Sequence, residues 1–301
     1  MGIILSASTT TKTYKLVKRI KAGGFDKEKL PSYSLCLQIG TRDFQFSVVN
    51  KQTNSCLYIE DYRLENIKTI NTRLEAIMEI TEKHPFLGSD LWDSIKISFK
   101  SHKFSLVPSS YFLPEASSDY LALNAEIKTK IEEVYYYKHI ASSAVNIFAC
   151  DKKVISWAKS KYKQRSVQVI HQGSALIEGI LKYDDHSHEK TMFCFVDKGI
   201  LHIAVSQKQA LQYYNQFAVR KSEDFLKYIM LVFKELSMSP KTSSLVVWGA
   251  IKNDAPHLDL LKKYIRNISL GTKPNFLKFG PEFEEVQDHR YFDIYSIFLC
   301  E

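Results

Sequence analysis

The chain has 301 residues, a formal net charge of +8, 45% hydrophobic residues and 25% charged residues. These proportions are ordinary for a globular protein, and a chain of this length is expected to form two domains with a large buried core. The longest apolar runs fall far short of the about 18 residues that a membrane span needs, so a transmembrane helix is excluded.

The five cysteines are widely scattered and show neither a CxxC pair nor the Cys/His spacing of a zinc site. Cys36, Cys56 and Cys194 lie in apolar, strand-like runs, where a free cysteine behaves as a small hydrophobic residue. This usage indicates a reducing compartment, and we expect a cytoplasmic protein.

The positive charge is concentrated in two segments. Residues 1–30 hold seven basic and two acidic residues, and residues 151–165 hold six basic residues and one acidic residue. A localised charge is more typical of a protein with an acidic partner than an even distribution is.

The first 30 residues predict a basic, partly disordered tail and lead-in, with order beginning at Tyr33. From there, hydrophobic residues alternate with polar ones, as in strands. Asn66 is the expected N-cap of the first helix, in which apolar residues recur at helical spacing. Strands are expected at 33–39, 44–48, 56–62, 94–99, 103–107, 132–140, 144–150 and 167–170. Helices are expected at 67–83, 114–124, 151–162 and 173–182.

A polar stretch at 183–190 interrupts this pattern and marks the expected domain boundary. We therefore assign 31–184 to a first lobe with inserted elements and 185–301 to a second lobe. Residues 184–189 include metal-ligand types, but we interpret them as a solvated linker and expect no metal site. Strands are expected at 191–196, 200–206, 210–217 and 245–248, and helices at 222–236, 254–266 and 291–299.

Both halves begin with three strands and continue with alternating helices and strands. Gln38-Ile39-Gly40 and Asp197-Lys198-Gly199 mark equivalent first hairpins. Hairpins followed by crossover helices predict a mixed sheet with helices on its faces.

Two such lobes resemble the superfamily of actin, sugar kinases and heat-shock ATPases. More narrowly, the chain resembles the Bacteroidota family of domain of unknown function 3822, which is associated with an actin-like ATPase fold. The residues that carry this resemblance are Tyr33–Thr41 (YSLCLQIGT) and Tyr291–Glu301 (YFDIYSIFLCE). The resemblance covers the chain from about residue 14. It implies an α/β, duplicated ribonuclease H-like fold whose lobes each contain a mixed five-stranded sheet flanked by helices.

The superfamily resemblance also implies an Mg-ATP site between the lobes. Working members use an Asp-x-Gly-Thr hairpin, a second Asp-x-Gly hairpin and a Gly-Gly strand end. The corresponding residues of this chain are Gln38, Gly40 and Thr41, then Asp197 and Gly199, and finally Gly249. Gln38 stands where the family has the aspartate that positions Mg²⁺, and an amide lacks the charge that this hard cation favours.

These departures favour a non-enzymatic, actin-like scaffold or interaction protein with a vestigial nucleotide cleft. We expect no cofactor and a protein partner of unknown identity. The alternative that the resemblance implies is an ATP-binding protein or ATPase with unusual loops.

A third hypothesis is nucleic-acid binding through the basic tail and the segment from Lys152 to Arg165. Lys152, Lys159 and Lys163 fall on one face of the expected helix, where they could contact phosphates, and Tyr135–Tyr137 could stack on bases. The simpler interpretation is a solvated, lysine-rich helix face, because no RNA-binding signature accompanies these residues.

Overall fold

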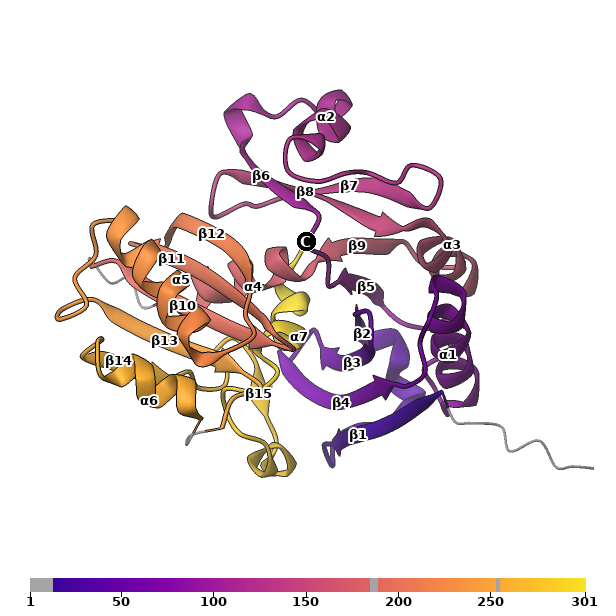
Figure 1. The fold of residues 1–301 in the computed structure, drawn as a ribbon. Coiled ribbons are helices and arrows are strands. Elements are labelled where there is room, and N and C mark those ends of the chain that lie inside the picture. Colours follow the sequence, from indigo (N-terminus) through magenta and orange to yellow (C-terminus); the bar gives the residue numbers. More distant parts are fainter. Residues whose placement is uncertain (1–12, 185–188, 253–254) are drawn as a thin grey trace, which may run out of the picture.

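The computed structural model describes residues 13–184, 189–252 and 255–301 (Figure 1). The described chain forms a seven-stranded sheet, a five-stranded sheet and a separate three-stranded sheet. The two large sheets, with their helices, form two lobes that lie side by side, and the small sheet lies above the first lobe in Figure 1. The expectation of a solvated linker at residues 184–189 falls mostly outside the described residues, because 185–188 are not among them.

The first lobe is built around five central strands in the order β4-β3-β2-β5-β9. The strands β2 and β3 are buried along almost their whole length, so polar residues that alternate with the apolar ones, such as Ser34 and Ser47, are buried as well. Their bounds are β2 (Tyr33–Ile39), β3 (Asp43–Asn50), β4 (Ser55–Leu64), β5 (Ser94–Phe99) and β9 (Val167–His171). The strand β3 runs antiparallel to both of its neighbours, β2 and β4, whereas β5 and β9 run parallel to β2.

The helices α1 (Ile70–Lys83) and α3 (Lys152–Lys161) belong to the same lobe. The expected cap of α1 at Asn66 is wrong. Thr69 caps this helix, because its hydroxyl accepts a hydrogen bond from the Thr72 N–H and the Thr72 hydroxyl accepts one from the Thr69 N–H.

The strand β1 (Tyr14–Lys21) corrects the expectation that order begins at Tyr33. It pairs antiparallel with β4 and forms the edge of the first sheet. Its alternate residues Lys15, Arg19 and Lys21 are exposed. Charged side chains on an open edge strand disfavour pairing with the edge of another sheet. The expectation for residues 1–12 lies outside the described residues. The short 3₁₀ helix η1 (Lys27–Ser32) connects β1 to β2.

The inserted elements predicted for the first lobe form the three-stranded sheet, in the order β6-β8-β7. These are β6 (Phe104–Pro108), β7 (Glu132–Lys138) and β8 (Ala144–Asp151), with α2 (Ser117–Ala122) and two 3₁₀ turns, η2 (Ser109–Tyr111) and η3 (Pro114–Ala116). The unit has a small core of its own, formed by Val107, Leu121, Val145, Ile147 and Ala149.

The second lobe repeats the first. Its strand order is β12-β11-β10-β13-β14. The strand β11 runs antiparallel to both of its neighbours, β10 and β12, whereas β13 and β14 run parallel to β10. The strands are β10 (Thr191–Asp197), β11 (Ile200–Gln207), β12 (Ala210–Ala218), β13 (Ser244–Gly249) and β14 (Asn267–Leu270). The helices are α5 (Ser222–Glu235) and α6 (Pro256–Lys262). The predicted duplication of a mixed five-stranded sheet is thus present.

Two helices lie between the lobes: α4 (Gln172–Tyr183), which ends the first lobe, and α7 (Phe292–Ser296), which continues into η5 (Ile297–Leu299) (Figure 1). They approach so closely that a side chain at Gly179 would collide with Ser296 Oγ, 2.0 Å away. The chain also returns from the second lobe as β15 (Lys278–Phe279), which pairs with β4, before η4 (Pro281–Glu285). The lobes are therefore joined by packing as well as by the linker.

Within the described ranges, no helix is both long enough and apolar enough to cross a membrane. All five cysteines are buried and unpaired, as the apolar runs around three of them predicted.

Candidate functional site

The first hairpin turn of the first lobe holds a carboxylate of its own. Gly40 N–H donates a hydrogen bond to the carbonyl oxygen of Asp43, at 3.0 Å, and the Asp43 side chain folds back over the turn. A Cβ atom at Gly40 would lie 2.1 Å from Asp43 Oδ1. Gly40 is therefore needed to make room for the Asp43 carboxylate.

The corresponding turn of the second lobe joins β10 to β11 through Lys198 and Gly199. Both residues have positive φ angles, 47° and 83°, and Asp197 pairs with Ile200 across the turn. This is the two-residue hairpin with two left-handed residues that matches the twist of antiparallel strands. Gly199 is thus explained by the turn itself, and Asp197 is fixed at the end of β10.

The ammonium of Lys100, directly after β5, connects the two turns. Its Nζ atom lies 2.6 Å from Asp43 Oδ2 and 2.7 Å from Asp197 Oδ2. Lys198, in the second lobe, also pairs with Asp43, with its Nζ atom 2.9 Å from Asp43 Oδ1. A lysine of the first lobe therefore bridges one carboxylate from each lobe.

The charges in this cluster stabilise one another. Burial alone would lower the pKa of Lys100, but Asp43, Asp197 and Asp293 outweigh that effect and raise this pKa well above its ordinary value. Burial would likewise raise the pKa of Asp197, but the Lys100 ammonium holds it at about 2. Lys100 is therefore charged and Asp197 ionised at neutral pH.

A layer of amides lies behind the ion pairs. Gln38 Nε2 and Gln172 Nε2 both donate hydrogen bonds to Asp293 Oδ2, at 2.7 and 2.9 Å, and Gln172 Nε2 also lies 3.2 Å from Asp197 Oδ2. Gln38 is fully buried, and its Oε1 has no hydrogen-bond partner among the described residues. Burial raises the pKa of Asp293, against the opposing effect of Lys100, and nearby Asp197 adds to the increase.

Two histidines near the turns are held neutral. Burial lowers the pKa of His171 to about 4 and that of His202 to about 3. His171 caps α4: its Nδ1 accepts from Gly173 N–H, so its Nε2 carries the proton and donates to Ser101 O at 2.9 Å. His202 Nδ1 lies 2.8 Å from the Tyr214 hydroxyl. Both imidazoles thus serve the local packing.

The space left around Lys100 is small. A cavity of about 160 Å³ is lined by Thr41, Lys100, Asp197 and their neighbours. Sites for drug-sized ligands usually measure about 300–1,000 Å³. Hydrated Mg²⁺ favours carboxylates, but Asp43 and Asp197 already bind ammonium groups, and Gln38 offers a neutral amide. These residues do not fit the metal that the fold family implies. The described residues contain no group of three or more metal-ligating side chains elsewhere.

Gly249 ends β13 with a φ angle of 112°. A Cβ atom there would lie 2.1 Å from the carbonyl oxygen of Val196, so close packing of β13 on β10 requires the glycine. Its N–H donates to His289 O at 2.8 Å, and its carbonyl oxygen lies 3.0 Å from His289 Nδ1. The backbone at this position is thus used within the fold.

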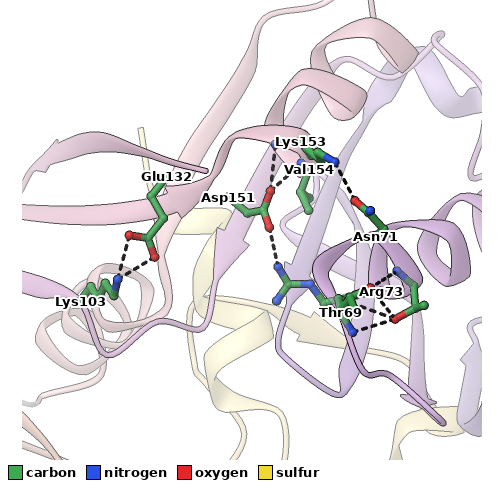
Figure 2. A network of polar contacts seen from close by, with 9 residues as sticks. Thr69, Asn71, Arg73, Lys103, Glu132, Asp151, Lys153 and Val154 are labelled. Carbon is green, nitrogen blue, oxygen red and sulfur yellow. Dashed lines mark hydrogen bonds and ion pairs between the residues drawn. The ribbon is translucent and has the colours of Figure 1, made fainter. Parts of the chain in front are cut away.

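The basic segment that was the nucleic-acid candidate lies at the junction of α3, α1 and the inserted sheet. Figure 2 shows Asp151 at the start of α3, where Oδ1 accepts from Lys153 N–H and Oδ2 accepts from Arg73 Nη2 at 3.1 Å. Lys153 Nζ donates to Asn71 Oδ1 at 2.8 Å. Beside this junction, Lys103 pairs with Glu132 at 2.8 Å. Several charges of the region are therefore used to join α1, α3 and the insertion.

The candidate lysines of α3 point to different places. Lys152 Nζ donates to the carbonyl oxygen of Thr129 at 2.6 Å, and Lys159 Nζ lies 3.3 Å from the Tyr135 hydroxyl and 5.5 Å from the centre of that ring. Lys163 and Arg165 are exposed beyond the end of the helix. The role of all four residues in nucleic-acid binding stays a prediction.

A family model described as "Protein of unknown function (DUF3822)" matches residues 22–268. This match spans more than half of the chain. The chain belongs to this family. A search of curated proteins found no match.

Solved structures similar to this DUF3822 protein share its fold. A Bacteroides thetaiotaomicron protein with an actin-like ATPase fold and unknown function is 20% identical, with a TM-score of 0.78, over 93% of this chain and 100% of that chain. A chain of the PilM–PilN type IV pilus biogenesis complex is 11% identical, with a TM-score of 0.53, over 88% and 97%. The ethanolamine utilization protein EutJ from Carboxydothermus hydrogenoformans is 8% identical, with a TM-score of 0.50, over 93% of each chain. The predicted actin-like ATPase fold is confirmed.

Four polar residues of the cleft of this DUF3822 protein were not predicted from its sequence: Asp43, Lys100, Gln172 and Asp293. Lys100 and Gln172 directly follow β5 and β9, two parallel strands, and the carboxyl ends of such strands are where sites form in open α/β sheets. That signal was available in the predicted strand ends. Asp293 lies within Tyr291–Glu301, one of the two segments that carried the family resemblance.

Proposed function

We propose that this protein is a non-enzymatic, actin-like scaffold in which an internal ammonium group holds the lobes together. The observation that supports it is the position of Lys100 between Asp43 and Asp197. The neighbouring aspartates raise the pKa of Lys100, so its ammonium stays charged at neutral pH and can bridge the two lobes without a bound metal or nucleotide. Phosphoryl transfer depends mostly on positioning and on charge neutralisation by metal ions. At the position where the fold family has a metal-binding aspartate, this chain has the neutral amide of Gln38, which argues against such an activity.

Titration of the purified protein with Mg-ATP by calorimetry tests this proposal. We expect no binding heat at micromolar protein and no phosphate release. Micromolar affinity together with ATP turnover would overturn the scaffold and establish an enzyme instead. Micromolar affinity without turnover would mean that the scaffold binds nucleotide, and would overturn the idea that Lys100 alone bridges the lobes.

A matched pair of variants tests the role of the cation. In Gln38→Asp, a second carboxylate faces Asp293 while Lys100 stays in place, so we expect no Mg²⁺-dependent gain in ATP affinity. In Gln38→Asp/Lys100→Ser, the carboxylate is added and the ammonium removed, so we expect Mg²⁺-dependent ATP binding that the single variant lacks. Circular dichroism checks that both variants are folded. Equal behaviour of two folded variants would contradict the idea that Lys100 occupies the position of a metal.

The inserted unit supports the interaction part of the proposal, because it carries most of the large exposed apolar side chains. Exposed apolar surface beyond scattered single residues often marks a protein interface. Of the ten large hydrophobic side chains exposed in the described chain, six lie on this unit. They are Tyr111, Leu113, Leu123, Ile131, Tyr136 and Ile140. One structural relative was itself solved within a PilM–PilN complex.

Cross-linking mass spectrometry on cells that express the tagged protein tests this surface. We expect cross-links to one protein partner from Lys130 and Lys138, which are exposed on the insertion. The variant Leu123→Asp/Ile140→Asp should lose these cross-links, because it places two charges on the apolar surface. Both side chains are about four-fifths exposed, so we expect the variant to fold. Cross-links that persist in the variant, or that come only from second-lobe lysines, would exclude the insertion as the interface.

A further inference from the structure

A second cavity, of about 690 Å³, lies at the other end of the first sheet. Its wall includes Ser94, at the start of β5, whereas Lys100 follows the end of that strand. Six residues of extended chain span about 20 Å, so this pocket is separate from the ion-pair cluster. It is formed by the β3–β4 turn, β5, the last turn of α4, the segment around β15 and the end of η5. Both lobes therefore contribute to it.

The pocket is strongly basic. Four lysines line it, Lys51, Lys96, Lys182 and Lys278, against one acidic residue, Glu301. Lys182 and Lys278 are exposed, and within the described part of the chain neither forms an ion pair. A lysine in the last turn of a helix is favoured by the helix dipole, which accounts for Lys182 but not for Lys278.

Two of the lysines are fixed in position. Lys96 is 9% exposed, and its Nζ donates to the carbonyl oxygen of Phe298 at 2.7 Å and lies 5.6 Å from the centre of that ring. Lys51 pairs with Asp93 at 2.8 Å. The pocket thus combines two positioned ammonium groups with two that are available to a ligand.

The pocket also has an apolar part. Phe276, Phe298 and Leu299 are half-buried and line the same cavity as the lysines. Lysine binds phosphate as a compact point charge, and an aromatic ring offers a face on which an apolar or aromatic group packs. The cavity volume is within the usual range for small-molecule sites.

We propose that this pocket binds a small organic phosphate, with the phosphate at Lys182 and Lys278 and an apolar or aromatic body against Phe276 and Phe298. The proposal is independent of the scaffold function, because it uses none of the residues of the cleft between the hairpin turns. A small molecule is favoured over a protein segment by the volume of about 690 Å³ and because charged and apolar side chains line the same cavity.

Calorimetry with phenyl phosphate, inorganic phosphate and phenol at low salt tests the ligand class. We expect phenyl phosphate to bind with a Kd below about 1 mM, more tightly than inorganic phosphate, and phenol not to bind. The affinity for phenyl phosphate should fall as salt is added, because the lysines are open to screening. The absence of phenyl phosphate binding at about 10 mM ligand would overturn the proposal, and inorganic phosphate binding as tightly as phenyl phosphate would remove the apolar part of it.

Charge variants locate the site. Lys182→Glu/Lys278→Glu should abolish phenyl phosphate binding, whereas Lys241→Glu/Lys263→Glu changes the net charge equally at exposed lysines outside the pocket and should leave the affinity unchanged. Glu301→Gln removes the acidic residue of the pocket and should raise the affinity about two- to fivefold. Equal losses in the two double variants would show a general charge effect and overturn the site. An unchanged affinity in folded Lys182→Glu/Lys278→Glu would also overturn it.

Discussion

Lys100 Nζ lies 2.7 Å from Asp197 Oδ2, so an ion pair joins the end of β5 in the first lobe to the end of β10 in the second. The Lys100 side chain is 11% exposed, and that of Asp197 15%. At this burial, removal of one partner leaves an uncompensated charge in a poorly hydrated place. The pair is thus a sensitive test of how the lobes are held together.

Lys100→Met should therefore destabilise the protein strongly. The substitution keeps an unbranched side chain that is only one atom shorter, but it leaves Asp43 and Asp197 without their shared cation. Removal of one member of a buried ion pair typically lowers the free energy of unfolding by about 3–5 kcal/mol. Urea denaturation followed by circular dichroism measures the loss.

Lys198→Met is the matched control. Lys198 contacts Asp43 too, but its side chain is 51% exposed. Solvent screens such a pair, and we expect a loss below about 1 kcal/mol. Equal losses for Lys100→Met and Lys198→Met would contradict the central role of Lys100.

Asp197→Asn should remove part of the acid sensitivity of the protein. The folded-state pKa of Asp197 is about 2, below the ordinary value of about 3.9. A depressed carboxyl pKa adds stability above the ordinary pKa, and this is lost as the pH falls through the folded-state value. With about 1.4 kcal/mol for each pKa unit, the contribution is about 2–3 kcal/mol.

The free energy of unfolding of wild-type protein and Asp197→Asn, measured from pH 7 to pH 2, checks this. The difference between the two should be largest above about pH 5 and should shrink as the pH falls from about 4 to 2. A difference in the free energy of unfolding that stays constant over this interval would mean that Asp197 stabilises the protein through packing or neutral hydrogen bonds, and that its charge contributes nothing.

Asp293→Asn should have the opposite sign. Burial raises the pKa of Asp293, so wild-type protein loses stability when the pH rises above the ordinary aspartate value and this buried group must ionise. Asparagine keeps an oxygen that accepts from Gln38 and Gln172 and carries no charge. We expect the variant to be more stable than wild-type protein at pH 7 and equal to it below about pH 4.

Thermal unfolding of Asp293→Asn and Asp293→Ala at pH 4 and pH 7 tests this prediction. The alanine variant loses the oxygen that accepts both amide hydrogen bonds, so it should be less stable than the asparagine variant at both values. An asparagine variant that is less stable than wild-type protein at pH 7 would mean that the negative charge beside Lys100 outweighs its burial.

The fold was predictable because its signals are local. Alternation at 33–39 and 44–48 and the glycine turns between strands fix the hairpins before any distant contact forms. The missed strands are of another kind. The alternation of apolar and polar residues in β1 breaks at Val17 and Lys18, where the pairing with β4 shifts its register. The strands β14 and β15 are short and form by pairing with strands farther away in the sequence.

The cleft was predictable only in part. Gln38 and Asp197 could be selected because each lies in a recognisable hairpin. The partner of Gln38, Asp293, is 255 positions away, and no periodic pattern links the two residues. Lys100 resembles any other lysine at a strand end until the second lobe places Asp197 beside it. Interactions between lobes therefore had to come from the structure.

The junction at Asp151 allows a helix cap and an ion pair to be measured separately. Asp151 Oδ1 accepts from the N–H groups of Lys153 and Val154, at 2.9 and 3.3 Å, while Oδ2 accepts from Arg73 (Figure 2). Asp151→Asn keeps a good N-cap but loses the ion pair, so we expect a loss of about 1–3 kcal/mol. Asp151→Ala also loses the cap, which adds about 1 kcal/mol.

Urea denaturation of both variants and of Arg73→Met, alone and combined with Asp151→Asn, completes the test. Since Arg73 and Asp151 are 15% and 7% exposed, their contributions should be coupled, and the double variant should be more stable than the sum of the single losses predicts. Additive losses would mean that the two side chains act independently. Equal losses for Asp151→Asn and Asp151→Ala would mean that the cap contributes nothing, and the start of α3 would then be held by the packing of Val154 and Ile155 alone.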